Sequence, residues 1–361
     1  MSDKLSNSLF TAWGKLTASQ WGGRAAFALL AIAVAIMPLF DFPQRAFWVR
    51  VVGYAGLYII LGLGLNVVVG FSGLLNLGYA AFYAIGAYTY ALLASDFFGL
   101  HFSFWLLLPI AAGLAALAGF LLGLPVMRTR GDYLAIVTLG FGEIIRILIT
   151  NLRGLTNGSQ GVIGIDSPML FGLEIHTGTH FYYLIFVFGL IMIFFTTRLS
   201  NSRLGRAWNA IREDEDAAEM TGINTNHYKL LAFSVGAFMG GLGGVIFAAW
   251  QGSIFPDNFN LFVSINTLSL IIIGGLGSIP GVVIGSFALI ALPDILRQFS
   301  DYRQLLFGLL LVIMMTVRPQ GFIPSRRLQM ELKPENGEIE PEPDEKQTPE
   351  VAEAPTGANP S

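Results

Sequence analysis

The sequence has no cysteine among its 361 residues, and charged side chains make up only 12% of it. The absence of cysteine excludes disulfides, thiolate metal sites and cysteine nucleophiles. The charged fraction is far below the roughly 25% of soluble domains, while hydrophobic residues reach 54% and the mean hydropathy is +0.63. This composition indicates an integral membrane protein with several spans.

Two kinds of ligand motif are also missing. No Walker A pattern of the form G-x-x-x-x-G-K-[ST] occurs, so any energy from a nucleotide has to come through a partner. The four histidines are His101, His176, His180 and His227. All fall in expected loops or near span ends, and none stands at a metal-ligand spacing from Asp or Glu. We expect this chain to bind no metal, no other cofactor and no nucleic acid.

The first 24 residues are polar, but apolar residues recur in them near helical spacing, at Leu5, Leu9, Trp13 and Leu16. They predict a short interfacial helix within a polar cytoplasmic leader, residues 1–24. The apolar run 25–40 that follows fits either the core of a signal peptide or a first membrane span. The long leader and the segment Pro38–Pro43, which is a poor cleavage site, favour a retained span.

Residues 25–322 contain apolar runs of about the 20 residues that cross a bilayer as a helix. We therefore predict an all-α fold, a polytopic transmembrane helical bundle of about ten spans. The predicted spans are 26–42, 47–66, 74–95, 103–126, 132–151, 180–197, 229–250, 264–279, 281–297 and 303–317. The eighth and ninth share the patch Gly274–Gly281, whose glycines and proline equally fit broken or re-entrant helices packed inside the bundle.

Lys and Arg in short loops predict the orientation of the spans. Ten spans place three basic clusters on the side of the N-terminus: Arg128 and Arg130; Arg198, Arg203, Arg206 and Arg212; Arg318, Arg326 and Arg327. We expect this side to be cytoplasmic, with both termini there and the protein in a bacterial inner membrane. Arg45 and Arg50 fall on the opposite side, against the rule. The longest loop on that side, 152–179, includes the turn-rich stretch Thr156–Gly161, which suits an ordered segment.

Acidic residues gather after the last span. Residues 331–361 carry nine Asp and Glu against two Lys, which leaves 19 Lys and Arg against 15 Asp and Glu in the rest of the chain. The membrane part is therefore mildly basic, although the whole chain has a net charge of -3. The Pro- and Glu-rich stretch 323–361 has too little apolar surface to fold, so we predict disorder there. A regulatory role and a dispensable solvated tail both fit it.

The stretch Gly70–Gly73, with the sequence Gly-Phe-Ser-Gly, has the form found around the nucleophile of rhomboid intramembrane proteases. A serine nucleophile needs a base within hydrogen-bond reach, and that base is usually histidine. None of the predicted spans contains a histidine in its interior; His180 is the first residue of the span 180–197. The pattern therefore favours small-residue packing at a helix break over catalysis by Ser72.

Two ionisable residues stand inside the fifth predicted span. Glu143 and Arg146 are three residues apart and share one face of a helix. Charged groups at membrane depth normally face the bundle interior or a water-filled path. Two interpretations follow, an element of a translocation pathway or gate and a structural ion pair between helices.

Polar residues also flank the glycine-rich breaks in both halves of the chain. Asn66 and Asn76 lie on either side of Gly70–Gly73, and Asn266 precedes the patch that begins with Gly274 and Gly275. Paired, glycine-interrupted segments in two halves are typical of transporter repeats with the substrate path at their interface. These residues are therefore candidates for the pathway, with ordinary glycine packing as the alternative.

The polar stretch 203–227 separates two long apolar runs and carries both basic and acidic residues. Trp208, Ile211 and, one turn on, Glu215 share a face, which predicts a short amphipathic helix outside the bilayer. Gly222 is a candidate for the end of that helix. A contact with a soluble partner and a solvated connector are the two interpretations.

From about Leu61 to Phe322 the sequence resembles the membrane permease subunits of ABC importers for branched-chain amino acids, the high-affinity leucine/isoleucine/valine type, M-type branch. The resemblance rests on Gly131–Arg146, Thr156–Gly161, Gly205–Glu219 with Gly222–Asn224 and Tyr228–Lys229, Gly274–Ser278, and Arg318–Phe322. Each stretch alone is a weak signal, but together they are specific. The acidic tail and the polar leader lie outside it.

The resemblance implies a heteromeric importer. Its expected partners are a second, homologous permease, two cytoplasmic ABC ATPase subunits that bind ATP and Mg, a periplasmic substrate-binding protein, and membrane lipid. The residues Asp216, Ala217, Ala218 and Gly222 look like the family's Glu-Ala-Ala-x-x-x-Gly element that docks on the ATPase, with Arg212 and Glu213 just before it. Here Asp216 replaces the glutamate, which keeps the charge on a shorter side chain.

The same resemblance leaves the substrate open. Relatives of this subunit serve importers of urea, short amides and other amino acids, and the choice of substrate lies largely with the binding protein. A stand-alone secondary transporter is a further alternative. In each case we expect a transport subunit and not an enzyme, with ATP hydrolysis by a separate partner.

Overall fold

A computed structural model describes residues 32, 34–39, 45–127, 129, 131–170, 173–295, 305, 308, 309, 312, 316 and 321–323. All of them belong to one contact unit, residues 1–325. The predicted leader 1–24, the acidic tail beyond residue 323 and most of the first and last predicted spans lie outside the described residues. So do five arginines of the basic clusters, Arg128, Arg130, Arg318, Arg326 and Arg327.

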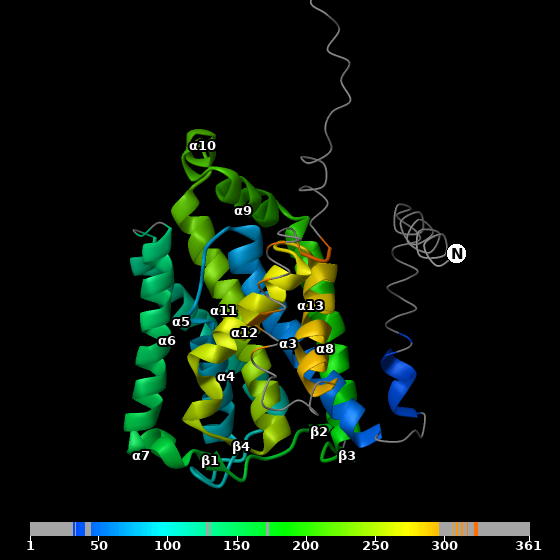
Figure 1. Cartoon of the computed structure of the whole chain (residues 1–361). Helices are drawn as coiled ribbons and strands as arrows, with labels where there is room; N and C mark the ends of the chain where they lie inside the picture. Colours follow the sequence, from blue (N-terminus) through cyan, green and yellow to red (C-terminus); the bar gives the residue numbers. More distant parts are fainter. Residues whose placement is uncertain are drawn as a thin grey trace, which may run out of the picture. The chain divides into compact units, whose positions relative to one another are not determined.

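The described part of the chain is a bundle of helices, which confirms the all-α polytopic class (Figure 1). Within it, six helical segments are long and apolar enough to cross a membrane. They are α3 (Arg45–Leu65) continued by η2 (Asn66–Phe71), α5 (Phe104–Val126), α6 (Asp132–Asn151), α8 (Gly178–Ser200), α11 (Thr225–Gln251), and η4 (Pro256–Phe259) continued by α12 (Leu261–Gly274).

The predicted number of about ten spans is not confirmed. The third predicted span, 74–95, is the helix α4 (Tyr79–Leu93), which at 15 residues is shorter than a bilayer-crossing helix needs to be. The ninth is α13 (Ile279–Ile295), whose apolar stretch, Ile279–Ile290, is also short. The short helix η1 (Met37–Leu39) is the described end of the first predicted span.

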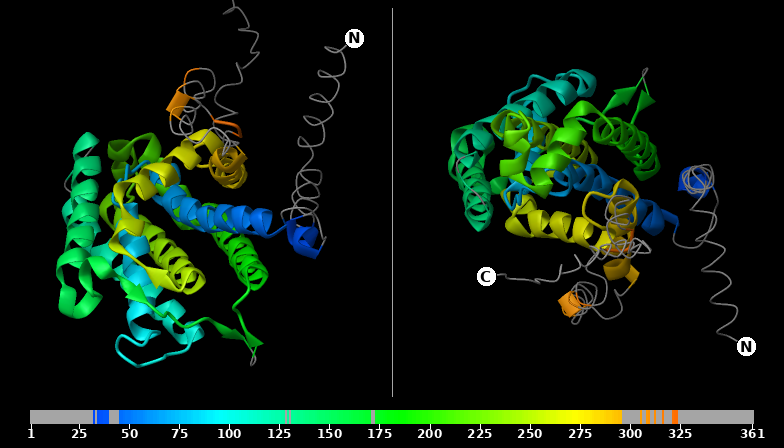
Figure 2. Two further views of the ribbon diagram at one scale, coloured as in Figure 1. Left: turned by 60° about the horizontal axis from the view of Figure 1, so that its bottom comes forward. Right: turned by 90° about the horizontal axis from the view of Figure 1, so that it is seen from above.

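Close contact between backbones holds the centre of the bundle together. The helix α11 packs against α3, α4 and α5, whereas α6 stands at the edge with most of its length exposed (Figure 2). A Cβ atom on Gly86 of α4 would overlap the backbone of Gly241, and one on Gly244 would overlap the carbonyl of Tyr83. Only glycine allows α4 and α11 to approach so closely, which is how helices gain packing contacts inside a membrane.

The helices α12 and α13 form an antiparallel pair. A Cβ on Gly274 would meet the carbonyl of Gly281, and one on Gly285 would meet the carbonyl of Leu270, so the two helices run past each other in opposite directions. The chain turns between them through Gly275 and Gly277, at φ +117° and +78°. The predicted helix break in the Gly274–Gly281 patch is therefore present.

Short irregular segments close the end of the bundle at which α7 (Arg153–Thr156) lies (Figure 1). They include η3 (Gly158–Gln160), β1 (Val162–Ile163), β2 (Met169–Leu170), β3 (Leu173–Glu174) and β4 (Ser253–Ile254). The strand β1 pairs antiparallel with β4, with Val162 opposite Ile254. A bridge between Ser95 and Ile165 joins the loop after α4 to the same segment. The loop 152–179 is thus ordered over its described residues, as its turn-rich composition predicted.

His101 links the loop after α4 to this segment. Its Nδ1 lies 2.7 Å from a carboxylate oxygen of Asp166, and its Nε2 lies 3.3 Å from one of Asp96. The backbone N–H of Asp166 donates to the carbonyl of Ala94 at 2.7 Å. The hydrogen bond to Asp166, followed by the charge of the same carboxylate, raises the pKa of His101 above its ordinary value. The protonated imidazole therefore stabilises this contact.

Because the pKa of His101 is raised in the folded state, its contribution to stability is complete below the ordinary histidine pKa of about 6.5. It is lost as the pH rises through the folded-state value. We expect an NMR titration of the His101 ring to show a raised pKa that falls toward 6.5 in Asp166→Asn. The matched change Asp96→Asn should have a smaller effect, since Asp96 is farther away. A pKa of His101 that Asp166→Asn leaves unchanged would contradict this assignment.

Candidate coupling site and its link to the membrane interior

Two short helices, α9 (Arg203–Glu213) and α10 (Glu215–Met220), project from the end of the bundle opposite α7 (Figure 1). The prediction of a single helix here was wrong, because Asp214 between them is extended, at φ −155° and ψ 116°. Asp214 instead caps α10 by accepting a hydrogen bond from the N–H of Ala217 at 2.9 Å. Ser202 caps α9 through the N–H of Gly205. Each cap satisfies a backbone donor that the helix leaves free.

The inner face of α9 fixes it on the start of α11. Trp208 is fully buried, and its Nε1 donates to the carbonyl of Tyr228 at 2.7 Å. Ile211 is buried beside it, so the predicted apolar face is present. The third member of that face, Glu215, belongs to the next helix. The α9–α10 element is therefore packed against the bundle and is not a loose connector.

Lys229 is an ionisable residue that the sequence analysis missed. It lies in the second turn of α11, its side chain is 2% exposed, and its Nζ lies 2.5 Å from an oxygen of Glu215, which is 23% exposed. A buried ammonium needs such a carboxylate, because the bare charge would be strongly destabilising. The pair joins α10 to α11. No local pattern predicts it, since its two residues are 14 positions apart in different helices.

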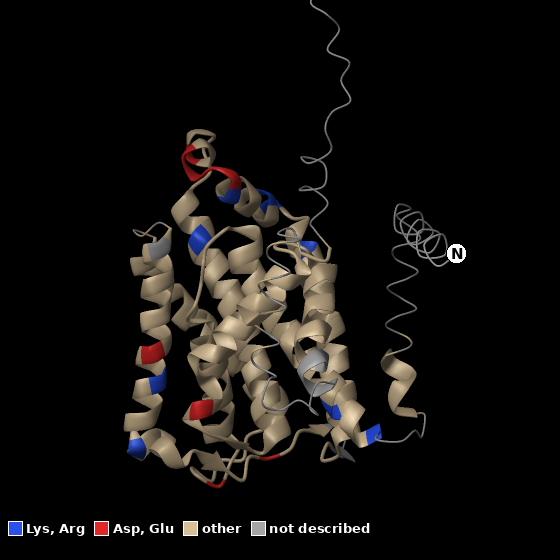
Figure 3. Ribbon diagram, viewed as in Figure 1, with Lys and Arg blue, Asp and Glu red and all other residues tan. Residues whose placement is uncertain are grey.

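The predicted docking residues are spread over the end of α9, the helix α10 and the residues just after it. Glu213, Asp216 and Ala217 are exposed, whereas Ala218 is 4% exposed and faces inward. Gly222 follows the end of α10 with φ +86°, a conformation that favours glycine. The predicted residues therefore form a rigid, acidic projection (Figure 3).

Arg212 is exposed, but its guanidinium reaches back to the broken end of α3. Its Nη1 donates to the carbonyl of Gly70 at 2.5 Å. Gly70 belongs to η2, the π-helical end of α3, and its carbonyl is one of those that a broken helix leaves without a regular partner. The contact therefore ties the projecting element to the helix break that the sequence predicted at Gly70–Gly73.

The second helix break meets the first at the same point. The Oδ1 of Asn66, which is fully buried in η2, accepts the backbone N–H of Gly277 at 3.0 Å. A Cβ atom on Gly70 would overlap Asn66, and one on Gly277 would lie 3.0 Å from the Nη1 of Arg212. The breaks in the two halves, which the sequence paired only by their composition, are in direct contact. We call Asn66, Gly70, Arg212 and Gly277 the junction.

Asn76 lies at the start of α4 and away from these four contacts. Its Oδ1 accepts the N–H of Gly78 at 3.0 Å, and the hydroxyl of Thr138 accepts the N–H of Leu77 at 3.1 Å. The amide nitrogens of Asn76 and Asn66 are buried, and neither has a hydrogen-bond partner among the described residues. Two side-chain amide groups in the interior are therefore left with donors that no described residue accepts.

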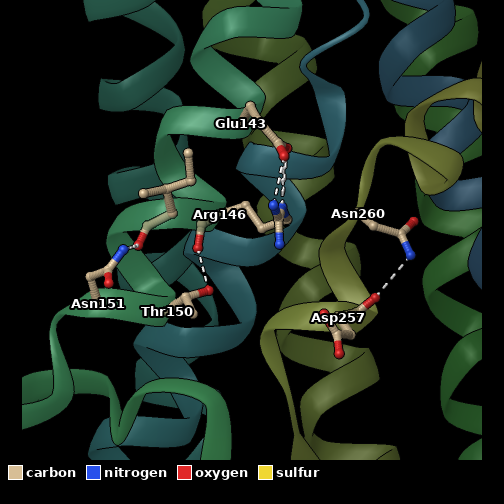
Figure 4. A network of polar contacts seen from close by, with 7 residues as sticks. Glu143, Arg146, Thr150, Asn151, Asp257 and Asn260 are labelled. Atoms are coloured by element: carbon tan, nitrogen blue, oxygen red, sulfur yellow. Dashed lines mark hydrogen bonds and ion pairs between the residues drawn. The ribbon is translucent and has the colours of Figure 1, made fainter.

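Glu143 and Arg146 form the ion pair that their spacing predicted (Figure 4). The Nη2 of Arg146 lies 2.7 Å from Glu143, and its Nε donates to both carboxylate oxygens at 3.0 and 3.1 Å. The side chain of Arg146 is 31% exposed and that of Glu143 is 44% exposed on a span, so this face of α6 needs a cover other than lipid. Asp257 and Asn260 of the neighbouring η4 segment add polar groups that the sequence analysis missed.

Asn266, Gly274 and Gly275 have local roles. The side chain of Asn266 on α12 lies near that of Tyr58 on α3. The carbonyl of Gly274 accepts the N–H of Ile323 at 3.0 Å, and Gly275 turns the chain between α12 and α13. These three residues stay candidates for the pathway. The structure brings only Asn66 and Arg212 of the predicted set to the junction.

Ser72, the residue of the alternative catalytic interpretation, is buried. Its hydroxyl donates to the carbonyl of Val68, four residues earlier, at 2.7 Å. This is the bond that serine hydroxyls commonly form within helices. The geometry supports the interpretation of Gly70–Gly73 as a helix break.

Comparisons with known proteins agree with the resemblance. Residues 47–315 match the family described as "Branched-chain amino acid transport system / permease component". The chain is 44% identical over 329 residues to the high-affinity branched-chain amino acid transport system permease protein LivM of Salmonella typhimurium, covering 85% of this chain and 76% of the relative. The LivM protein of Escherichia coli K12 gives the same values. LivH of Salmonella typhimurium is 27% identical over 285 residues, covering 74% and 91%. No solved structure matches.

The Lys229–Glu215 pair allows the packing of the α9–α10 element on the bundle to be tested without a transport assay. Glu215→Gln leaves a buried ammonium without its carboxylate and should lower the free energy of unfolding by about 3 kcal/mol. The double change Glu215→Gln with Lys229→Met should recover most of that loss, since no buried charge is left. Thermal unfolding of the purified protein in detergent measures both, with Glu219→Gln, an exposed residue of the same helix, as the control. A loss no larger in Glu215→Gln than in this control would refute the role of the pair.

Proposed function

Because this chain belongs to the family of branched-chain amino acid transport permease components, we propose that it is the membrane-spanning permease subunit of an ABC importer for branched-chain or related amino acids. The substrate class comes from the names of its relatives, which are branched-chain amino acid transport permeases. The family is one of transport components, so the chemistry of ATP belongs to a different subunit.

The importer contains this chain and a second, homologous permease. Relatives with two permease names, LivM and LivH, both match the chain, which supports a two-permease system. Two cytoplasmic ATPase subunits bind ATP and Mg, and a periplasmic binding protein delivers the substrate. In this arrangement the protein lies in the inner membrane of a bacterium, with its termini and the α9–α10 element in the cytoplasm.

The α9–α10 element is the docking site for the ATPase. Its exposed face offers the carboxylates of Glu213 and Asp216, and Met220 is 88% exposed. Its inner face is anchored by Trp208 and by the Lys229–Glu215 pair. A rigid element with one anchored and one free face transmits a displacement instead of absorbing it.

The single observation that carries the proposal is the junction. Arg212 reaches from the docking element to Gly70, and Gly277 reaches to Asn66 beside it. A movement of α9–α10 by the ATPase therefore changes contacts at both helix breaks, and the attached helices α8 and α11 carry the same movement along the bundle. ATP changes the side of the membrane to which the pathway opens, because the contacts at the junction differ between the two conformations of the permease.

Docking is tested by Asp216→Lys together with Gly222→Val. The first reverses a charge on the exposed face, and the second forces a β-branched residue into a positive φ at the end of α10. We expect the variant to insert normally but to lose co-purification with the ATPase and uptake of leucine into vesicles. Gly99→Val is the control, since Gly99 has φ +65° and open space around its Cβ at the opposite end of the bundle.

Wild-type uptake by the double variant would sink the docking assignment. Uptake by the chain alone under an ion gradient, with no ATPase present, would instead identify a secondary transporter. The ligand of the co-purified binding protein distinguishes an amino acid importer from one for urea or short amides.

The junction is tested separately by Arg212→Gln. Loss of a charged hydrogen bond is worth about 1.5–3 kcal/mol, so substrate moved per ATP should fall about tenfold or more. Binding of the ATPase should persist, because the guanidinium of Arg212 is already bonded to Gly70 of the bundle. As the control, Arg203→Gln removes one positive charge from the exposed start of α9 and should leave the amount of substrate moved per ATP unchanged. Loss of ATPase binding in Arg212→Gln would move this residue to the docking surface and refute its role in the junction.

A further inference from the structure

Arg45 and Arg50 stand at the end of the bundle where the orientation rule predicts few cations. The helix α3 begins at Arg45 and, with η2, runs 27 residues to Phe71. Its far end carries Gly70, which contacts Arg212 of the docking element. At about 1.5 Å per residue, Arg45 therefore lies roughly 40 Å from that end. The two arginines need a local explanation.

Both arginines line a cavity of about 580 Å³. Its walls come from the ends of three spans: α3 begins at Arg45, α8 begins at Gly178, and α11 ends at Gln251. The cavity therefore lies at the depth where a span meets the lipid headgroups. Tyr54 and Trp250, whose ring centres are 4.5 Å apart, complete it. Tyr and Trp are the side chains that membrane interfaces favour.

The cavity carries positive charge that no described residue of its wall offsets. The described residues that line it include no Asp or Glu. Among the described residues, neither Arg45 nor Arg50 takes part in an ion pair. The amide of Gln251, which donates to the hydroxyl of Tyr54 at 2.8 Å, adds a polar group. Two guanidinium groups and neutral polar groups suit a phosphate, which accepts several charged hydrogen bonds at once.

A second, apolar groove lies farther along the same two helices and is walled on another side by α13. On α3 it is lined by Gly53, Gly56 and Ile59, and on α8 by Ile185 and Gly189. The stripe Arg45, Val49, Val52, Gly56 of α3 follows one helical face from the cavity into the groove. A Cβ on Gly189 would find no atom within 4 Å, so the groove is open beside it.

We propose that the cavity and the groove together bind one anionic phospholipid. Its phosphate lies between Arg45 and Arg50, and an acyl chain lies along the groove between α3 and α8. The charged end stands at the headgroup level and the apolar end at hydrocarbon depth, which matches the two ends of a lipid in order and in chemistry. A free amino acid or a soluble phosphate fills only the cavity and leaves the apolar groove without an occupant.

Native mass spectrometry of the purified full chain tests the site, with phosphatidylglycerol and phosphatidylcholine of identical acyl chains as probes. We expect phosphatidylglycerol to bind about tenfold tighter than phosphatidylcholine, the size of one charged hydrogen bond. The double change Arg45→Gln with Arg50→Gln should remove this preference. The control is Arg153→Gln with Arg203→Gln, which also removes two positive charges, but from exposed positions outside the cavity.

The groove is tested by Gly189→Leu, whose Cβ meets no atom within 4 Å, with thermal unfolding as the check that the fold is kept. It should weaken phosphatidylglycerol about tenfold, because buried apolar contacts of the acyl chain are lost. Glycerol phosphate, which has no acyl chain, should bind weakly and equally to the wild type and to this variant. Equal binding of the two lipids by the wild type, or unchanged phosphatidylglycerol binding in the arginine variant, overturns the proposal. Glycerol phosphate binding as tightly as the lipid overturns it too.

Discussion

Lipid offers no hydrogen-bond partner to a backbone group, so the groups freed where a membrane helix breaks have to be satisfied by the protein itself. This constraint explains why the two breaks of this chain lie together. The carbonyl of Gly70 accepts from Arg212, and the N–H of Gly277 donates to Asn66. The first break thus satisfies a backbone group of the second, and the donor to the first break comes from the projecting helix α9.

The same constraint decides which parts of the fold are rigid. The helices α4 and α11 approach at Gly86 and Gly244 until their backbones touch. The neighbouring helices α3 and α5 pack against this central pair. The edge helix α6 has no such contact on its outer side and exposes the pair of Glu143 and Arg146. A tightly packed centre and a partly uncovered, polar edge suit a subunit that works beside another chain.

The sequence predicted what depends on local spacing. The 3.6-residue period placed Trp208 and Ile211 on a buried face, and the three-residue spacing of Glu143 and Arg146 predicted their ion pair. It did not predict contacts between distant positions. Asn66 and Gly277 are 211 residues apart, and no pattern near either one points to the other. The extended Asp214 that divides α9 from α10 was missed because each helix alone continues the same periodic pattern.

The hairpin of α12 and α13 also depends on residues that come long after it. The N–H groups of Phe322 and Ile323 donate to the carbonyls of Ile273 and Gly274, at 2.8 and 3.0 Å. These bonds satisfy carbonyl groups in the last turn of α12, which have no N–H partner within the helix. The membrane fold therefore requires the chain as far as Ile323, and the acidic stretch begins only after the last of these bonds. Position 324 is, on this ground, the natural point for attaching a reporter without disturbing the helix break.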